Sequence, residues 1–179
     1  MTAVEIALYY DDKTYYEHGF HYYDSNVNSS DGSDCTNFVS VCLNGAGIPM
    51  TDEWYWNSYT TGGFRGFFGK STTDASATWL NPDPFYRYFI QNGRNVGINY
   101  IPKGTDLSLV PNGVLPGDVI AFNNFSDVSP GIINNLGIVT SIQADGIHYS
   151  GHSNKREDAS LHETQKGFNG DIYIIRIGY

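Results

Sequence analysis

The fold of this 179-residue chain is decided by one stretch, Asp34-Cys35-Thr36-Asn37-Phe38-Val39-Ser40-Val41-Cys42-Leu43. Its apolar residues recur at helical spacing and predict one buried helix face; they are Phe38, Val39, Cys42 and Leu43. The side-chain oxygens of Asp34 and Thr36 can cap the start of this helix, and the glycines and proline of residues 45–49 end it. Cys35 then lies at the positive end of the helix dipole, where a thiol ionises more readily to the nucleophilic thiolate.

Two alternative interpretations give Cys35 a structural role instead of a catalytic one. It is either a small buried hydrophobic residue or the disulfide partner of Cys42. The disulfide is disfavoured, because residues seven apart in one helix lie about 10 Å apart, beyond bridging range. The odds between a functional and a structural Cys35 thiol stay even at this point. The sequence contains no CxxC pair and no HExxH motif, so we expect neither a metal nor another cofactor.

The composition excludes several classes of function. The chain has 19 acidic and 10 basic residues, and this net charge of −9 argues against a nucleic-acid partner. No apolar run approaches the roughly 20 residues that a membrane span needs. Residues 1–5 lack the basic start and apolar core of a signal peptide. We expect a single domain over residues 1–179, acting as a monomer or as part of a longer chain.

Helices precede strands along the chain. We expect one helix over residues 3–23 and another over 79–92 that starts around Asn81, before Pro82. Five strands are expected, at 96–101, 119–122, 136–142, 147–150 and 171–177. Asp145-Gly146 predicts a hairpin between the third and the fourth of them. This order is typical of an α+β domain with helices packed on one antiparallel sheet.

Several segments together resemble a known family. The run DCTNFVS at 34–40, followed by CLNGAGIPM and WYW, is similar to the putative amidase domain of bacterial cell-wall proteins. Further matching segments are ATW at 77–79, LPGDVI at 115–120, GIVT at 137–140 and SGHSN at 150–154. The resemblance implies a papain-like fold of the NlpC/P60 and CHAP type, with N-terminal helices packed on an antiparallel sheet of about five or six strands. It also implies a cysteine-dependent amide hydrolase that acts on peptidoglycan or a peptide, and a secreted or cell-wall-associated location.

One departure from the family affects its catalytic residues. The related families have a histidine at the start of the strand that matches 136–140, and Asn135 occupies that position here. An asparagine side chain cannot take up or deliver a proton at neutral pH. Three interpretations follow: a protein that binds substrate without cleaving it, a base supplied by His152 with Asn154 orienting it, or a different alignment of residues 129–135.

A substrate groove is the other feature that the sequence suggests. The glycine-rich segment 51–78 is strongly aromatic, and aromatic walls suit sugar rings or peptide side chains. We count Trp54, Trp56 and Trp79 as substrate-binding candidates, together with Asp34 beside the cysteine. The alternatives are that the aromatic rings fill the core and that Asp34 only caps the helix. Beside the hydrolase, two further functions stay open: a catalytically silent binding module, and a secreted effector or toxin that hydrolyses a protein amide.

Overall fold

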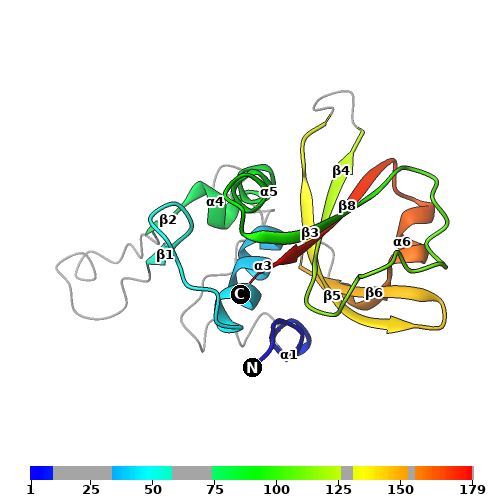
Figure 1. The fold of residues 1–179 in the computed structure, drawn as a ribbon, viewed down its shortest axis with the longest axis horizontal. Helices are drawn as coiled ribbons and strands as arrows, with labels where there is room; N and C mark the ends of the chain where they lie inside the picture. Colours follow the sequence, from blue (N-terminus) through cyan, green and yellow to red (C-terminus); the bar gives the residue numbers. More distant parts are fainter. Residues whose placement is uncertain (10–33, 58–73, 126–130, 153–155, 179) are drawn as a thin grey trace.

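The computed structural model describes residues 1–9, 34–57, 74–125, 131–152 and 156–178. Within these residues the chain is an α+β protein, as expected (Figure 1). Its helices are α1 (Ala3–Tyr9), α3 (Asp34–Gly45), α4 (Ala77–Leu80), α5 (Pro82–Gln91) and α6 (Leu161–Lys166). A short two-stranded sheet pairs β1 (Trp56–Asn57) with β2 (Asp74–Ala75). None of the described helices has the length and apolar character that crossing a bilayer requires.

The main sheet has six antiparallel strands in the order β3-β8-β4-β5-β6-β7. They are β3 (Asn95–Ile101), β4 (Val119–Asn124), β5 (Asn135–Gln143), β6 (Gly146–Gly151), β7 (Arg156–Ser160) and β8 (Gly170–Ile177). The five expected strands are all present, each within two residues of its predicted bounds. The central strands β4, β5 and β8 are apolar on both faces, which requires both faces of the sheet to be covered.

Two apolar clusters cover the two faces of this sheet. Side chains from α1, α3, α4 and α5 pack on one face, against residues such as Ala121, Leu136 and Ile138. On the other face, residues 102–118 and α6 pack against residues such as Phe122 and Tyr149. Figure 1 shows α6 across the sheet from α3. Because strand residues alternate between faces, the register determines which side chains can reach α3.

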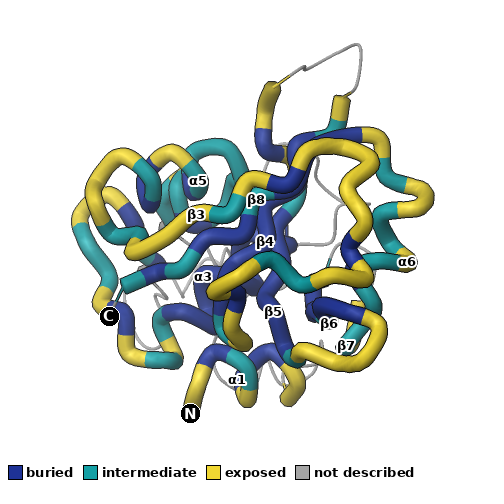
Figure 2. The backbone as a smooth tube through the Cα atoms, turned by 45° about the vertical axis from the view of Figure 1, so that its right-hand side comes forward, coloured by how far each residue is buried: buried dark blue, intermediate teal, exposed yellow. Residues whose placement is uncertain are grey.

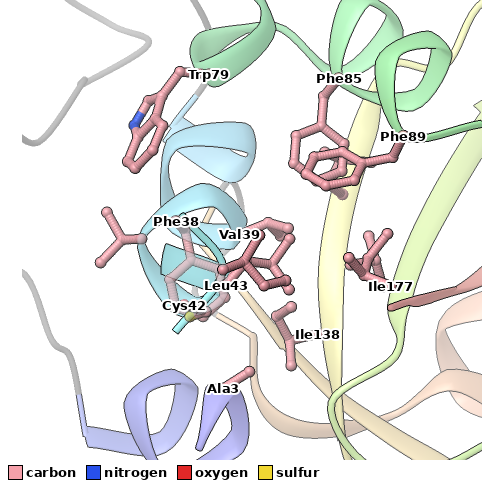
Figure 3. Close-up of a cluster of buried hydrophobic side chains, with 14 of the residues drawn as sticks. Ala3, Phe38, Val39, Cys42, Leu43, Trp79, Phe85, Phe89, Ile138 and Ile177 are labelled. Atoms are coloured by element: carbon pink, nitrogen blue, oxygen red, sulfur yellow. The ribbon is translucent and has the colours of Figure 1, made fainter. Parts of the chain in front are cut away.

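Helix α3 is the most deeply buried of the helices that cover the first face of the sheet. All of its residues from Asp34 to Leu43 are buried, and dark blue marks its course and that of β4 and β5 in Figure 2. Phe38, Val39, Cys42 and Leu43 point into the cluster around Ile138 (Figure 3). The predicted helix and its apolar face are therefore confirmed.

The helix expected over 79–92 is divided in two by Asn81. Asn81 has an extended backbone (φ −118°, ψ 134°), so α4 ends before it and α5 begins at Pro82. The cause is Pro82, whose ring disfavours the helical conformation for the residue before it. The sequence patterns also missed β1, β2, β7 and α6, which are short and have no strong apolar period.

The predicted hairpin at Asp145-Gly146 is confirmed. It joins β5 to β6, with Gln143 opposite Gly146. Gly146 has φ +113°, which favours glycine, and a Cβ atom there would lie 2.4 Å from the carbonyl oxygen of Leu107. Of the helix expected over 3–23, the structure describes residues 3–9, which form α1. The part from residue 10 onward lies outside the described residues.

Candidate active site

Cys35 is the second residue of α3 and lies in the first turn of that helix. Its side chain is fully buried, and its Sγ atom lies 3.7 Å from the hydroxyl of Thr36. The first-turn amides of a helix have no partners inside the helix, so this turn can stabilise negative charge on a sulfur or on an oxyanion. The predicted position of Cys35 in the first turn of the helix is confirmed, and its role as a nucleophile stays a prediction.

His152 comes to the same turn of α3 from the far end of the chain. It follows β6 directly, and Ser150 pairs with Ile138, which belongs to the α3-side cluster. Two residues further along, His152 faces the same side. Its Nδ1 atom lies 2.6 Å from Oδ2 of Asp34, and its ring stacks on Phe38 with ring centroids 4.2 Å apart. The structure thus brings together two of the predicted site residues, His152 and Asp34, the second of which directly precedes Cys35 in the sequence.

The contact with Asp34 determines how the neutral imidazole carries its proton. An ionised carboxylate only accepts hydrogen bonds, so Nδ1 of His152 is the donor and carries the proton. The lone pair of the neutral ring is then on Nε2. A neutral Nε2 is the atom that takes a proton from a thiol in acyl-transfer chemistry.

A chain of hydrogen bonds continues from Asp34 into the core. The amide Nδ2 of Asn37 donates to Oδ1 of Asp34 over 3.4 Å, and the indole Nε1 of Trp79 donates to Oδ1 of Asn37 over 2.9 Å. Every member except His152 is less than 5% exposed. Buried polar groups linked in this way hold one another in a single geometry. Asp34 therefore orients His152, and Asp34 is itself held in place by Asn37, which Trp79 holds in turn.

The tryptophans counted as substrate-binding candidates are all buried. Trp54 and Trp79 have no exposed surface and stack with ring centroids 4.9 Å apart, while Trp56 is 6% exposed. The Nε1 atom of Trp54 donates to Oγ of Ser40. These contacts give the rings a role in the core, beside α3. Any substrate contact by them stays a prediction.

Asn135 is placed away from the Asp34–His152 pair. It is the first residue of β5 and pairs with Phe122, a residue of the cluster on the α6 side. Its neighbour Leu136 faces α3 instead. The side chain of Asn135 therefore lies on the opposite face of the sheet from Cys35. Asn154, the expected orienting residue, lies outside the described residues.

The second cysteine has no place in this group. Cys42 is fully buried in the core, where burial raises the pKa of its thiol well above the ordinary value. Both cysteines are free, as expected from their spacing. Within the described ranges there is no group of three or more histidine, cysteine or carboxylate side chains that could hold a metal ion.

Sequence reasoning missed the pairing of Asp34 with His152 and the part played by Asn37. The available signal was chemical: Asp34, Asn37 and Ser40 are polar residues in a helix expected to be buried, and buried polar groups need partners. Nothing in the sequence paired these residues with their partners outside the helix, which lie 14 to 118 residues away.

A thiol, an imidazole and a carboxylate at the start of one buried helix form a set of groups suited to acyl transfer. The sequence model of the family described as "Putative amidase domain" matches residues 2–175, and the chain belongs to this family. The family description makes the protein a hydrolase of amides. Searches of curated proteins and of solved structures found no match to the chain.

Proposed function

We propose that the chain is a cysteine-dependent amide hydrolase of papain-like type, with Cys35 as nucleophile and His152 as base. The observation that carries the proposal is the 2.6 Å contact between Nδ1 of His152 and the carboxylate of Asp34, the residue directly before Cys35. With the proton on Nδ1, the lone pair of the neutral imidazole is on Nε2, the atom that acts as the base in this proposal. In this proposal Asp34 takes the orienting role, in place of Asn154.

The reaction follows the usual course for a thiol and an imidazole. The thiol of Cys35 attacks the amide carbonyl carbon, and its proton passes to Nε2 of His152. The first-turn amides of α3 stabilise the oxyanion. The C–N bond then breaks, His152 gives its proton to the leaving amine, and a thioester remains. Water, deprotonated by His152, cleaves the thioester to release the acid and restore the thiol.

The substrate class rests on the family resemblance. We propose amide bonds of bacterial peptidoglycan or a related peptide, and a protein that works outside the cell or at the cell wall. The resemblance to domains of cell-wall proteins supports this. The catalytic unit in this proposal is one domain over 1–179, alone or within a longer chain.

The test is turnover of purified peptidoglycan, followed by mass spectrometry of the released fragments. We expect new amines and carboxylates from the natural chain, and none from Cys35→Ala or His152→Gln. His148→Gln is the matched histidine control, because His148 interacts with Asp145 and Asp158 instead of α3 and should retain turnover. Equal turnover by Cys35→Ala and the natural chain would refute a cysteine mechanism.

A second candidate function is a silent binding module of the same fold. Two observations favour it: the side chain of Cys35 is fully buried, and Asn135 occupies the position of the family histidine. The rates of iodoacetamide labelling of Cys35 and Cys42 in the folded protein separate the two candidates. Selective labelling of Cys35 supports the hydrolase. If neither cysteine is labelled and the protein still binds peptidoglycan without cleaving it, the binding module is correct.

A further inference from the structure

A cavity lies on the face of the sheet opposite Cys35. It has a volume of about 380 Å³ and is formed where the ends of β4, β5 and β6 meet β7, α6 and the residues that follow α6. This volume is within the range of small-molecule sites. In Figure 1, α6 lies on the far side of the sheet from α3, and neither Asp34 nor His152 lines the cavity.

The floor of the cavity is aromatic. Phe122, Tyr149 and Phe168 line it, with the ring of Phe122 centred 5.6 Å from that of Tyr149 and 5.4 Å from that of Phe168. The hydroxyl of Tyr149 donates to Thr164 on α6, which holds the ring in place. A fixed aromatic floor suits the apolar part of a ligand.

The polar lining includes hydrogen-bond donors and one positive charge. Arg156 is the single charged residue that lines the cavity among the described residues, in a chain with a net charge of −9. The other described arginines have partners: Arg87 pairs with Asp83, Arg176 with Asp118, and Arg94 lies over the ring of Tyr88. In the part of the chain that the structure describes, no hydrogen bond or ion pair involves the guanidinium of Arg156.

Asparagine side chains are the second polar part of the lining. Asn124, Asn134 and Asn135 line the same cavity. The side-chain oxygen of Asn135 accepts a hydrogen bond from the backbone N–H of Leu136, and its Nδ2 group has no partner among the described residues. A guanidinium and amide N–H groups can bind an anionic oxygen pair, and no carboxylate is among the described residues that line this cavity.

We infer that this cavity is a binding site for a small carboxylic acid with an apolar side chain, such as an N-acylated amino acid. Its carboxylate pairs with Arg156 and the Asn135 amide, and its apolar part contacts the ring of Phe122 or Phe168. The site is independent of the hydrolytic function, because no member of the Cys35 group lines it.

The test uses the full chain and N-acetyl-L-phenylalanine, with N-acetyl-L-phenylalaninamide as the uncharged matched probe. Binding is measured by calorimetry and by NMR shifts of the Arg156 side chain and the Asn135 backbone amide. We expect saturable binding of the acid, at least about tenfold weaker binding of the amide, and a similar loss in Arg156→Gln. Arg94→Gln is the control, since it removes one arginine outside the cavity, and it should bind as the natural chain does.

Several outcomes would overturn the inference. They are no saturable binding of the acid, equal affinity for acid and amide, an unchanged affinity in Arg156→Gln, or NMR shifts confined to α3. Displacement of the acid by inorganic phosphate at equal concentration would also contradict it, because it would indicate a general anion contact. The readout is binding alone, so a failed hydrolase assay leaves this result interpretable.

Discussion

The hydrogen bond between Trp79 and Asn37 makes a quantitative prediction for stability. Trp79→Phe removes the indole N–H and leaves the buried Oδ1 of Asn37 without its donor, which costs about 1–3 kcal/mol. Loss of ring volume in a fully buried position adds about 1–2 kcal/mol. The sum is about 2–5 kcal/mol, a large part of the stability of a typical domain.

In Asn37→Leu, the new side chain has nearly the same shape as asparagine, and the indole N–H of Trp79 loses its acceptor. In the double variant Trp79→Phe/Asn37→Leu, neither the donor nor the acceptor remains. Its loss of unfolding free energy should therefore fall short of the sum of the single losses by about 1–2 kcal/mol. Urea unfolding followed by circular dichroism measures all four proteins, and a loss of 2–5 kcal/mol lowers the midpoint by about 1–2.5 M for a slope of about 2 kcal/mol/M.

The control for this cycle is Asn44→Leu, on the same helix. The Nδ2 group of Asn44 donates to the carbonyl of Ile48 and has no bond with Trp79. Combined with Trp79→Phe, it should give additive losses. If the Asn37 cycle is additive too, the two side chains are not coupled, and the support of Asp34 from the core proposed above is refuted.

Three further predictions concern single positions. Burial lowers the pKa of His148, but its hydrogen bonds to Asp145 and to the backbone of residue 158 outweigh this and raise it overall. The folded state therefore binds this proton more tightly, so His148 stabilises the fold below about pH 6.5 and loses this effect as the pH rises through the folded pKa. Urea unfolding should show a larger deficit for His148→Gln at about pH 5.5 than at about pH 8.5; a constant deficit would contradict the pairing. Gly146→Ala should cost more than about 1 kcal/mol, through positive φ and the nearby Leu107 carbonyl, and more than Gly104→Ala, where φ is also positive but space is open; equal losses in thermal unfolding would contradict the clash. Asn135→His should not raise peptidoglycan turnover, because its side chain faces away from Cys35.

Much of the fold could be predicted from sequence patterns. The α3 helix, the central strands and the hairpin at Gly146 have strong local signals: helical spacing, apolar runs and an Asp-Gly pair. The break at Asn81 could also have been predicted, because a proline disfavours the helical conformation of the residue before it. The apolar period across Asn81 instead suggested one helix. Strand β7 has no such signal, because Arg156–Ser160 is polar and depends on pairing with β6.

The site could be predicted only in part. The position of Cys35 at the start of α3 could be predicted because its signal is local: a small polar loop, a cysteine and an apolar helix. The hydrogen bond between Asp34 and His152 could not, because it depends on the register of strands more than 100 residues away. The tryptophans show the same limit. An aromatic segment has the same sequence pattern whether its rings line a groove or fill a core. Trp54 and Trp79 are buried beside α3, where their indole N–H groups donate to Ser40 and Asn37.

Side chains alternate between the two faces of a strand, and this alternation distinguishes the two positions considered for the catalytic base, 135 and 152. Ile138 faces α3 and pairs with Ser150, so the even-numbered neighbours Leu136 and His152 share that face. Asn135 is one residue out of step and faces the other way, where it lines the cavity with Arg156. A regular strand cannot present both 135 and 136 to the same helix. The asparagine that would disable a hydrolase built on position 135 therefore leaves a hydrolase built on His152 intact. For this reason the proposed mechanism depends on the Asp34–His152 contact.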